Sequence, residues 1–178
     1  MAQDLFTVGH GTLEAAHFVE LLQGAGVSLL VDIRIAPGSR RLPQFNKEDM
    51  EVWLPRSGIG YHWEKALGGR RKPDPGSVNL ALRNEAFRGY ADYMATPAFS
   101  EALDEVLDLL DTDQVAVMCS ESLWWRCHRR LVADAATLAR ERGVRHLMHS
   151  GRLEPHRVTE GARLNADGLV VYDGVLGT

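Results

Sequence analysis

The segment from Cys119 to Arg130 gathers residue types that attack or bind charged ligands. Cys119 ends an apolar run and precedes an expected helix, where backbone amides and the helix dipole favour an anion or a thiolate. Glu121 is placed either to cap the amides of that helix or to activate a water molecule. Three residues of the segment are expected to hold an anionic ligand: Arg126, His128 and Arg129. The guanidinium fork matches phosphate and carboxylate, which is the reason for this expectation.

Cys119 admits other interpretations besides that of a nucleophile of the sulfurtransferase or phosphatase kind. It is one residue further from Arg126 than the cysteine of the usual phosphatase loop is from its arginine, and free cysteine is commonly a small core residue. Together with Cys127, His128 and His10 it would supply zinc-ligand types, but the spacing is not that of a finger or ribbon, so we predict no metal. A disulfide with Cys127 is disfavoured in a reducing compartment.

Two further strand ends carry ionisable side chains. Asp32 closes the apolar run 29–33 and leaves the face taken by its neighbours, so it is expected as a general base, as a ribose-binding carboxylate or as an ion-pair partner of a loop arginine. His10 stands between Gly9 and Gly11, where the backbone can approach a ligand closely. Its imidazole is either catalytic or hydrogen-bonded to the backbone.

Arginines dominate the positive charge and fall in expected loops or at helix starts. Lys47, Lys65 and Lys72 are the only lysines among the 20 basic residues. The remaining candidates for ligand binding are Arg34, Arg40, Arg41, Asn46, Arg70, Arg71 and Arg88. Trp124 and Trp125 cannot both face inward, so one of them, taken as Trp125, is expected near the ligand or exposed, where an indole stacks on bases.

Composition limits the class of protein. A chain of 178 residues fits one domain spanning 1–178, and its net charge of −4 argues against coating nucleic acid by bulk positive charge. No apolar run reaches the about 18 residues of a membrane span, and the first residues lack a secretory pattern, so we expect a cytoplasmic protein with reduced thiols. Neither a dinucleotide fingerprint nor a Walker-type loop is present, and we predict no cofactor.

Apolar runs alternate with helical patterns along the chain. Strands are expected over 5–8, 29–33, 59–63, 115–118 and 144–148, and helices after Thr12, Asn46 and Thr96 and over 125–142. This order predicts a three-layer, Rossmann-like α/β domain with a mainly parallel sheet of about five strands. A hairpin is expected around 170–172 in the extension 150–178. Because ligands bind beyond the carboxyl ends of such strands, the segments after the first, second and fourth strands converge on one site.

Several segments together resemble the domain of unknown function 488 family. They are Thr7–His10, Val31–Arg34, Ser39–Lys47, Leu67–Arg71, Asn84–Met94, Met118–Glu121 and Arg126–Arg129. The resemblance runs from about residue 7 to residue 149 and implies a Rossmann-like fold in which these motifs act together. Gly11 stands where serine is commoner, and Ser120 where alanine is commoner.

These patterns predict a protein that binds a phosphate-bearing ligand, with a nucleotide or nucleic acid favoured by the arginines and aromatic residues. The leading hypothesis is an enzyme of hydrolase or base-excision type, as in DNA repair, in which Asp32 or Glu121 activates water. The alternatives are a thiol enzyme acting through Cys119 and a non-enzymatic module that binds nucleic acid.

Overall fold

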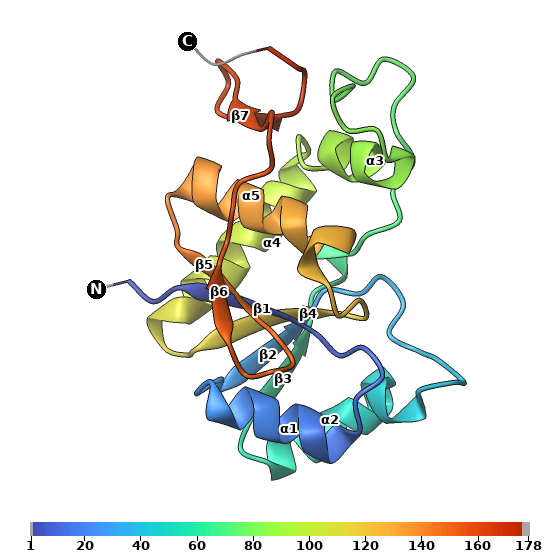
Figure 1. Cartoon of the computed structure of the whole chain (residues 1–178), viewed down its shortest axis with the longest axis vertical. Helices are drawn as coiled ribbons and strands as arrows, with labels where there is room; N and C mark the ends of the chain where they lie inside the picture. The colour runs from blue at the N-terminus through green and yellow to red at the C-terminus, as the bar shows by residue number, and fades with distance from the viewer. Residues whose placement is uncertain (1, 176–178) are drawn as a thin grey trace.

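The computed structural model describes residues 2–175, and a six-stranded sheet runs through them (Figure 1). The strand order across the sheet is β3-β2-β4-β1-β5-β6. The bounds are Leu5–Gly9 (β1), Leu29–Asp32 (β2), Gly60–Trp63 (β3), Val115–Cys119 (β4), Val144–Leu147 (β5) and Leu153–Pro155 (β6). Strands β1 to β5 pair in parallel, and β6 pairs antiparallel with β5. The prediction of a mainly parallel sheet is confirmed, and β6 is an additional strand.

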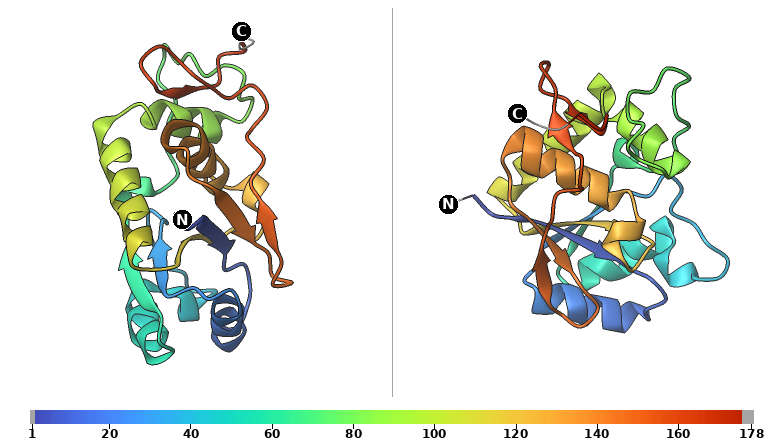
Figure 2. Two further views of the ribbon diagram at one scale, coloured as in Figure 1. Left: turned by 90° about the vertical axis from the view of Figure 1, so that its left-hand side faces the viewer. Right: turned by 45° about the horizontal axis from the view of Figure 1, so that its top comes forward.

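Helices cover both faces of this sheet, as Figures 1 and 2 show. On one face lie α1 (Ala15–Gly24) and α2 (Lys47–Arg56), and on the other lie α3 (Glu85–Tyr93), α4 (Pro97–Asp108) and α5 (Arg129–Arg140). Each face has its own buried apolar cluster, which the sheet separates from the other. The chain therefore has the three-layer, Rossmann-like α/β fold that the alternation of strands and helices predicts.

The alternation of side chains along the strands decides which face each polar strand end occupies. In β4, Val115 and Val117 join the apolar cluster under α3, α4 and α5, whereas Ala116 and Met118 join the cluster under α1 and α2. Cys119 continues the first of these series and lies on the α5 face. Asp32 follows Val31 of the α5-face cluster and therefore lies on the α1 face.

Two helices begin at other residues than the sequence indicates. Thr12 belongs to a turn, and α1 begins three residues later with Glu14 as its N-cap. The helix predicted over 125–142 is shorter at both ends, because Trp124–Arg126 forms a separate 3-10 turn (η4) and Cys127 is extended. At the other end Glu141 adopts a left-handed conformation with φ of 51°, which stops α5 before Arg142.

The residues after β5 pack back on the domain. The hairpin predicted around 170–172 is present as β7 (Arg163–Leu164) paired with β8 (Val170–Val171). Tyr172 is fully buried and joins the apolar cluster under α5. Among residues 2–175 no helix has the length and apolar character needed to cross a bilayer.

Candidate functional site

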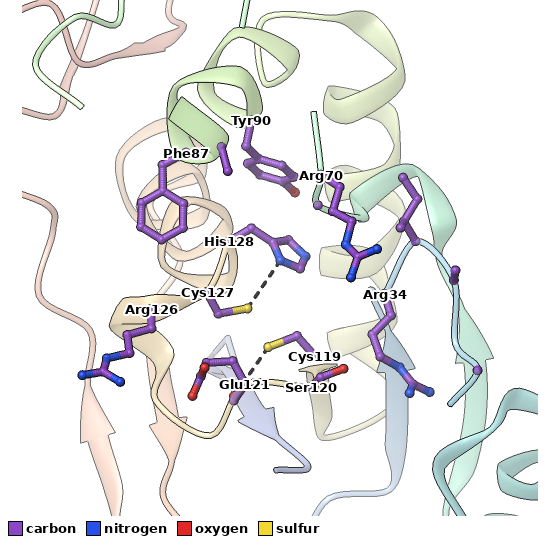
Figure 3. A pocket seen from close by; sticks show the side chains of 15 residues that line it. Arg34, Arg70, Phe87, Tyr90, Cys119, Ser120, Glu121, Arg126, Cys127 and His128 are labelled. Carbon is purple, nitrogen blue, oxygen red and sulfur yellow. Dashed lines mark hydrogen bonds between the residues drawn. The ribbon is translucent and has the colours of Figure 1, made fainter. Parts of the chain in front are cut away.

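A cavity of about 520 Å³ opens at the carboxyl edge of the sheet, between the loops after β2 and β4 and the first turns of α3 and α5 (Figure 3). The ionisable residues of its lining are Arg34, Arg70, Cys119, Glu121, Arg126, Cys127 and His128. The segments after β2 and β4 meet here, as expected. Gly9, at the end of β1, contributes by close packing: a Cβ at this position would lie 1.7 Å from the carbonyl oxygen of Glu121.

The two cysteines lie side by side at the base of the cavity, with their sulfur atoms facing each other in Figure 3. The Cys119 Sγ accepts a hydrogen bond from Arg129 Nε at 3.0 Å and lies 3.6 Å from the Glu121 carbonyl oxygen. Burial raises the pKa of the Cys119 thiol, and the adjacent Cys127 raises it further. Cys119 therefore remains a thiol that can donate its proton to a neighbouring thiolate.

Cys127 has the opposite tendency. Burial acts to raise its pKa, but the hydrogen bond from Cys119 and the Arg129 cation outweigh burial and lower the pKa to about 7. The backbone N–H of Arg129, in the first turn of α5, also stabilises the thiolate. The pKa of Cys127 is thus lowered and that of Cys119 is raised.

His128 is held in one orientation against Cys127. Its Nε2–H donates to the Ile33 carbonyl oxygen at 3.1 Å, which leaves Nδ1 as an acceptor 3.4 Å from the Cys127 Sγ. Burial lowers the pKa of His128, so the ring is neutral and able to accept the thiol proton. Gly69 packs on the ring so closely that a Cβ there would lie 3.0 Å from Nδ1.

Behind the thiols, Arg129 starts a buried series of hydrogen bonds that we call the Arg129–Asp134 chain. Arg129 Nη1 donates to Thr7 Oγ1 at 3.1 Å, and Thr7 Oγ1 lies 2.6 Å from His146 Nδ1. His146 Nε2 lies 2.9 Å from His156 Nδ1, and His156 Nε2 lies 2.8 Å from Asp134 Oδ1. With His146 neutral, its Nδ1 accepts from the Thr7 hydroxyl and its Nε2–H points to His156, so this part of the series runs from the cation toward the carboxylate. Burial lowers the pKa of His146 to about 3, which keeps this order at neutral pH.

The far end of the chain is closed by residues of the C-terminal extension. Asp134 is fully buried and also accepts from the Tyr172 hydroxyl at 2.7 Å and from the Thr159 backbone N–H at 2.9 Å. The indole of Trp124 stacks on His146, with ring centroids 4.1 Å apart. This stacking holds η4 against β5.

The carboxylate of Asp32 is fully hydrogen-bonded within a second buried cluster, on the α1 face. Its Oδ1 accepts from the Arg34 backbone N–H and from Arg34 Nε, at 3.1 and 2.9 Å. Its Oδ2 accepts from Arg34 Nη2 at 2.7 Å and from the Tyr61 hydroxyl at 2.6 Å. A carboxylate has about four acceptor positions, and this one is fully buried with two donors on each oxygen. Of the roles expected for Asp32, the geometry fits the ion pair.

His10 belongs to the same cluster and not to the cavity lining. Its Nδ1–H donates to the Gly11 carbonyl oxygen at 2.8 Å, its Nε2 faces Arg34 Nη1 at 3.3 Å, and its ring stacks on Phe45. Burial lowers the pKa of His10 to about 4, and the Arg34 cation contributes. Of the two roles expected for His10, catalytic or hydrogen-bonded to the backbone, the geometry fits the second.

The other predicted arginines fall into two groups. Arg70 and Arg126 line the cavity, and neither guanidinium has a hydrogen-bond partner among residues 2–175. Arg71 lies over the Tyr93 ring at 3.7 Å and donates to Gly68, and Arg88 donates to the Leu82 carbonyl oxygen.

Four remaining candidates lie outside this cavity. Arg40 and Arg41 are exposed in the loop after β2, and Asn46 uses its Oδ1 to accept the Ser39 backbone N–H at 2.6 Å. Trp125 is 43% exposed and lines a different cavity, beside η4. In the part of the chain that the structure describes, no group of three or more metal-ligand side chains is arranged to hold an ion.

Sequence reasoning assigned no catalytic role to Cys127 and treated Arg129 as a ligand-binding residue. It assigned no role to His146, His156 or Asp134, and it named Thr7 only as part of the family segment Thr7–His10. The signal for Thr7 is strand parity, because it shares the Leu5 face of β1. The two histidines and Asp134 are distant in sequence, and no local pattern connects them.

Comparison with known proteins gives one match. No curated protein and no solved structure matches the chain. A family model described as a domain of unknown function, DUF488, matches residues 14–136, which is more than half of the chain. The motifs from Val31 to Arg129 lie inside this stretch, and Thr7–His10 lies before it. The chain belongs to the DUF488 family.

Proposed function

We propose that this protein is a thiol-dependent enzyme that binds a phosphate-bearing ligand in the cavity and attacks it with Cys127. The observation that carries this proposal is the pairing of the Cys127 Sγ with His128 Nδ1, whose other ring nitrogen is anchored on Ile33. A nucleophile, a base beside it and a third group that orients the base form the arrangement used in covalent catalysis. The Arg129 cation supports it by favouring the thiolate.

The cavity supplies the means to bind an anion. Arg70 and Arg126 have no acidic partner among residues 2–175, so their charges are available to a ligand. Phe87 and Tyr90 provide an apolar wall between these polar groups. The volume lies within the usual range of small-molecule sites, about 300–1,000 Å³. A ligand with a phosphate group for the arginines and a planar or apolar group for the wall of Phe87 and Tyr90 would fit this cavity.

The chemistry then proceeds in two steps. His128 Nδ1 takes the proton of the Cys127 thiol, the sulfur attacks an electrophilic phosphorus or acyl carbon, and the leaving group departs with the proton from the imidazolium. Water next attacks the covalent intermediate and gives a proton to His128. The product leaves as the sulfur regains that proton, which returns the site to its starting state.

Alkylation by iodoacetamide as a function of pH tests the nucleophile. In Cys119→Ser the remaining Cys127 should react with a midpoint near its pKa of about 7, because serine still donates a hydrogen bond to the thiolate. In Cys127→Ser the remaining Cys119 should resist labelling up to well above about pH 8.5, the ordinary thiol value. Inorganic phosphate should slow the labelling of Cys127, and Arg70→Gln should weaken that protection.

His128→Asn provides the control for the base. It should abolish turnover, while the alkylation midpoint of Cys127 stays at about 7 because Cys119 and Arg129 set that pKa. The far-ultraviolet circular dichroism should stay that of the folded protein. A midpoint for Cys127 at or above about 8.5 in the Cys119→Ser protein would contradict the proposal.

Water activation by Glu121 is the second candidate, since its carboxylate lines the same cavity and its Oε1 holds the Leu123 backbone N–H at 3.1 Å. A hydrolysis screen with nucleoside phosphates and oligonucleotides separates the candidates. Loss of turnover in Glu121→Gln but not in Cys127→Ser would favour hydrolysis by water, and the reverse favours the thiol. If the unaltered protein binds these compounds without hydrolysing them, the protein is a non-enzymatic binding module.

A further inference from the structure

A second cavity, of about 380 Å³, lies beside η4 and is separate from the cavity of the cysteines. One wall consists of Trp124 and Trp125, and the other consists of residues 152–157 of the C-terminal extension. The extension lies beyond residue 136, where the family match ends. This cavity is therefore built jointly by a family motif and by a segment outside the matched region.

Trp125 presents an exposed but firmly supported indole at this cavity. Its side chain is 43% exposed, and its ring packs edge-on against Trp124 with centroids 5.6 Å apart. Trp124 in turn stacks on the fully buried His146. An aromatic surface that is held rigidly in water is a platform on which a planar group can stack at little cost in side-chain entropy.

The opposite wall carries two exposed arginines, Arg152 and Arg157. Neither side chain has a hydrogen-bond or ion-pair partner among residues 2–175, whereas Arg140, Arg145 and Arg163 are each paired with an aspartate. Glu154 is the single acid in the lining. The local charge is thus positive on a chain whose net charge is −4, and it complements a polyanion.

The turn η4 forms the ridge between the two cavities. Trp125 lines the second cavity, and Arg126, the next residue, lines the first. In Figure 3 the guanidinium of Arg126 points away from the two sulfur atoms, toward the outside of the first cavity. Consecutive residues of η4 therefore line the two cavities.

We propose that the second cavity binds single-stranded nucleic acid, with one base stacked on Trp125 and backbone phosphates on Arg152 and Arg157. The strand continues over Arg126 into the first cavity. This inference identifies the phosphate-bearing ligand as a nucleic acid strand. Only the passage of the strand into the first cavity rests on the proposed function. A single strand is required because a base in a duplex is stacked between its neighbours and cannot lie on an indole.

The test is the fluorescence anisotropy of a labelled oligothymidylate and of the matching oligouridylate, titrated with the full chain at several salt concentrations. Both should bind, and tighter binding of one of them identifies DNA or RNA as the preferred strand. Trp125→Ala should weaken binding by roughly 5- to 150-fold, the usual effect of removing one stacked base. Trp125→Phe should restore most of it, and Trp125→Leu should not.

The arginines are tested through the salt dependence. Each phosphate contact to a single strand contributes about 0.7 to the slope of log K against log salt concentration, so Arg157→Gln should reduce the slope by about that amount. Arg56→Gln is the matched control, because Arg56 is exposed at the end of α2 and lines neither cavity, and it should leave the slope unchanged.

Failure of this inference and failure of the proposed function are seen in different measurements. Equal binding by the unaltered protein and Trp125→Ala, equal rescue by leucine and phenylalanine, or equal affinity for duplex DNA overturns the stacking site. The alkylation experiment contains no oligonucleotide, and an unreactive Cys127 there contradicts the thiol mechanism without affecting the result for Trp125.

Discussion

Arg34 and Arg129 are both buried at the carboxyl edge of the sheet, one on each face, with exposed fractions of 8% and 1%. Arg34 meets its carboxylate directly, through two hydrogen bonds to Asp32 two residues away. Arg129 has no carboxylate within ion-pair distance among residues 2–175, and it reaches Asp134 through Thr7 and two histidines. The charge of Arg34 is thus balanced by a carboxylate in direct contact, whereas the charge of Arg129 is balanced by a distant one.

The difference supports placing the proposed thiol chemistry on the α5 face. A buried cation in direct contact with a carboxylate has little influence on other groups, because the two charges cancel at short range. The charge of Arg129 is balanced remotely, so it acts on the sulfur atoms of Cys119 and Cys127, where it lowers the pKa of Cys127. Arg34 is accordingly a structural residue of the cavity wall, and Arg129 is the residue that tunes the site.

Acidification should disrupt both faces, and this is the largest effect that we expect. His10 and His146 have pKa values of about 4 and about 3 in the folded chain, below the ordinary 6.5. The unfolded chain therefore binds more protons below about pH 6.5, and stability falls as the pH decreases. A difference of one in pKa corresponds to about 1.4 kcal/mol, so the free energy of unfolding should drop by several kcal/mol by pH 4.

Urea denaturation at a series of pH values measures this loss, and single variants divide it between the faces. His10→Gln and His146→Gln should each make stability less dependent on pH, and His146→Gln should do so more strongly because its pKa is further from 6.5. An unchanged dependence in both variants would show that other groups cause acid unfolding.

Removal of each arginine should separate stability from reactivity. Arg34→Gln leaves the buried Asp32 without its partner and should cost about 3–5 kcal/mol in urea denaturation. Arg129→Gln removes the donors to Cys119, Thr7 and Glu121 and should also destabilise the fold. Arg129→Gln should also move the alkylation midpoint of Cys127 upward from about pH 7, whereas Arg34→Gln should move it much less. Arg129→Lys, which keeps the charge, is the control if Arg129→Gln does not fold. Equal shifts in the two variants would contradict the comparison.

The sequence predicts which face of the sheet each strand-end side chain occupies better than it predicts which groups that side chain contacts. Side-chain alternation in β2 places Asp32 opposite to Val31, and the same rule applied to β4 separates Cys119 from Met118. This parity is a local property and follows from the strand assignment. It predicts correctly that Asp32 leaves the face of its neighbours, but it does not predict that Arg34 and Tyr61 occupy the carboxylate.

The role that we propose for Cys127 could not be predicted from the sequence, because it depends on where α5 begins. A helix from Trp125 would include Cys127, whereas the 3-10 turn Trp124–Arg126 leaves it extended just before the first turn of α5. That turn is fixed by the stacking of Trp124 on His146, a contact between residues far apart in the chain. Helical propensity does not report such tertiary contacts.

Two tyrosines provide the finest comparison, because each donates its hydroxyl to one of the buried aspartates, Tyr61 to Asp32 at 2.6 Å and Tyr172 to Asp134 at 2.7 Å. A hydrogen bond to a charged group contributes about 1.5–3 kcal/mol. Tyr172→Phe should cost the upper value, since Asp134 has no guanidinium in ion-pair contact among residues 2–175 and the Tyr172 side chain is fully buried. Tyr61→Phe should cost the lower value, because Arg34 still holds both oxygens of Asp32. Urea denaturation at neutral pH measures both, and a larger loss for Tyr61→Phe would mean that the directly paired aspartate is the less well compensated of the two.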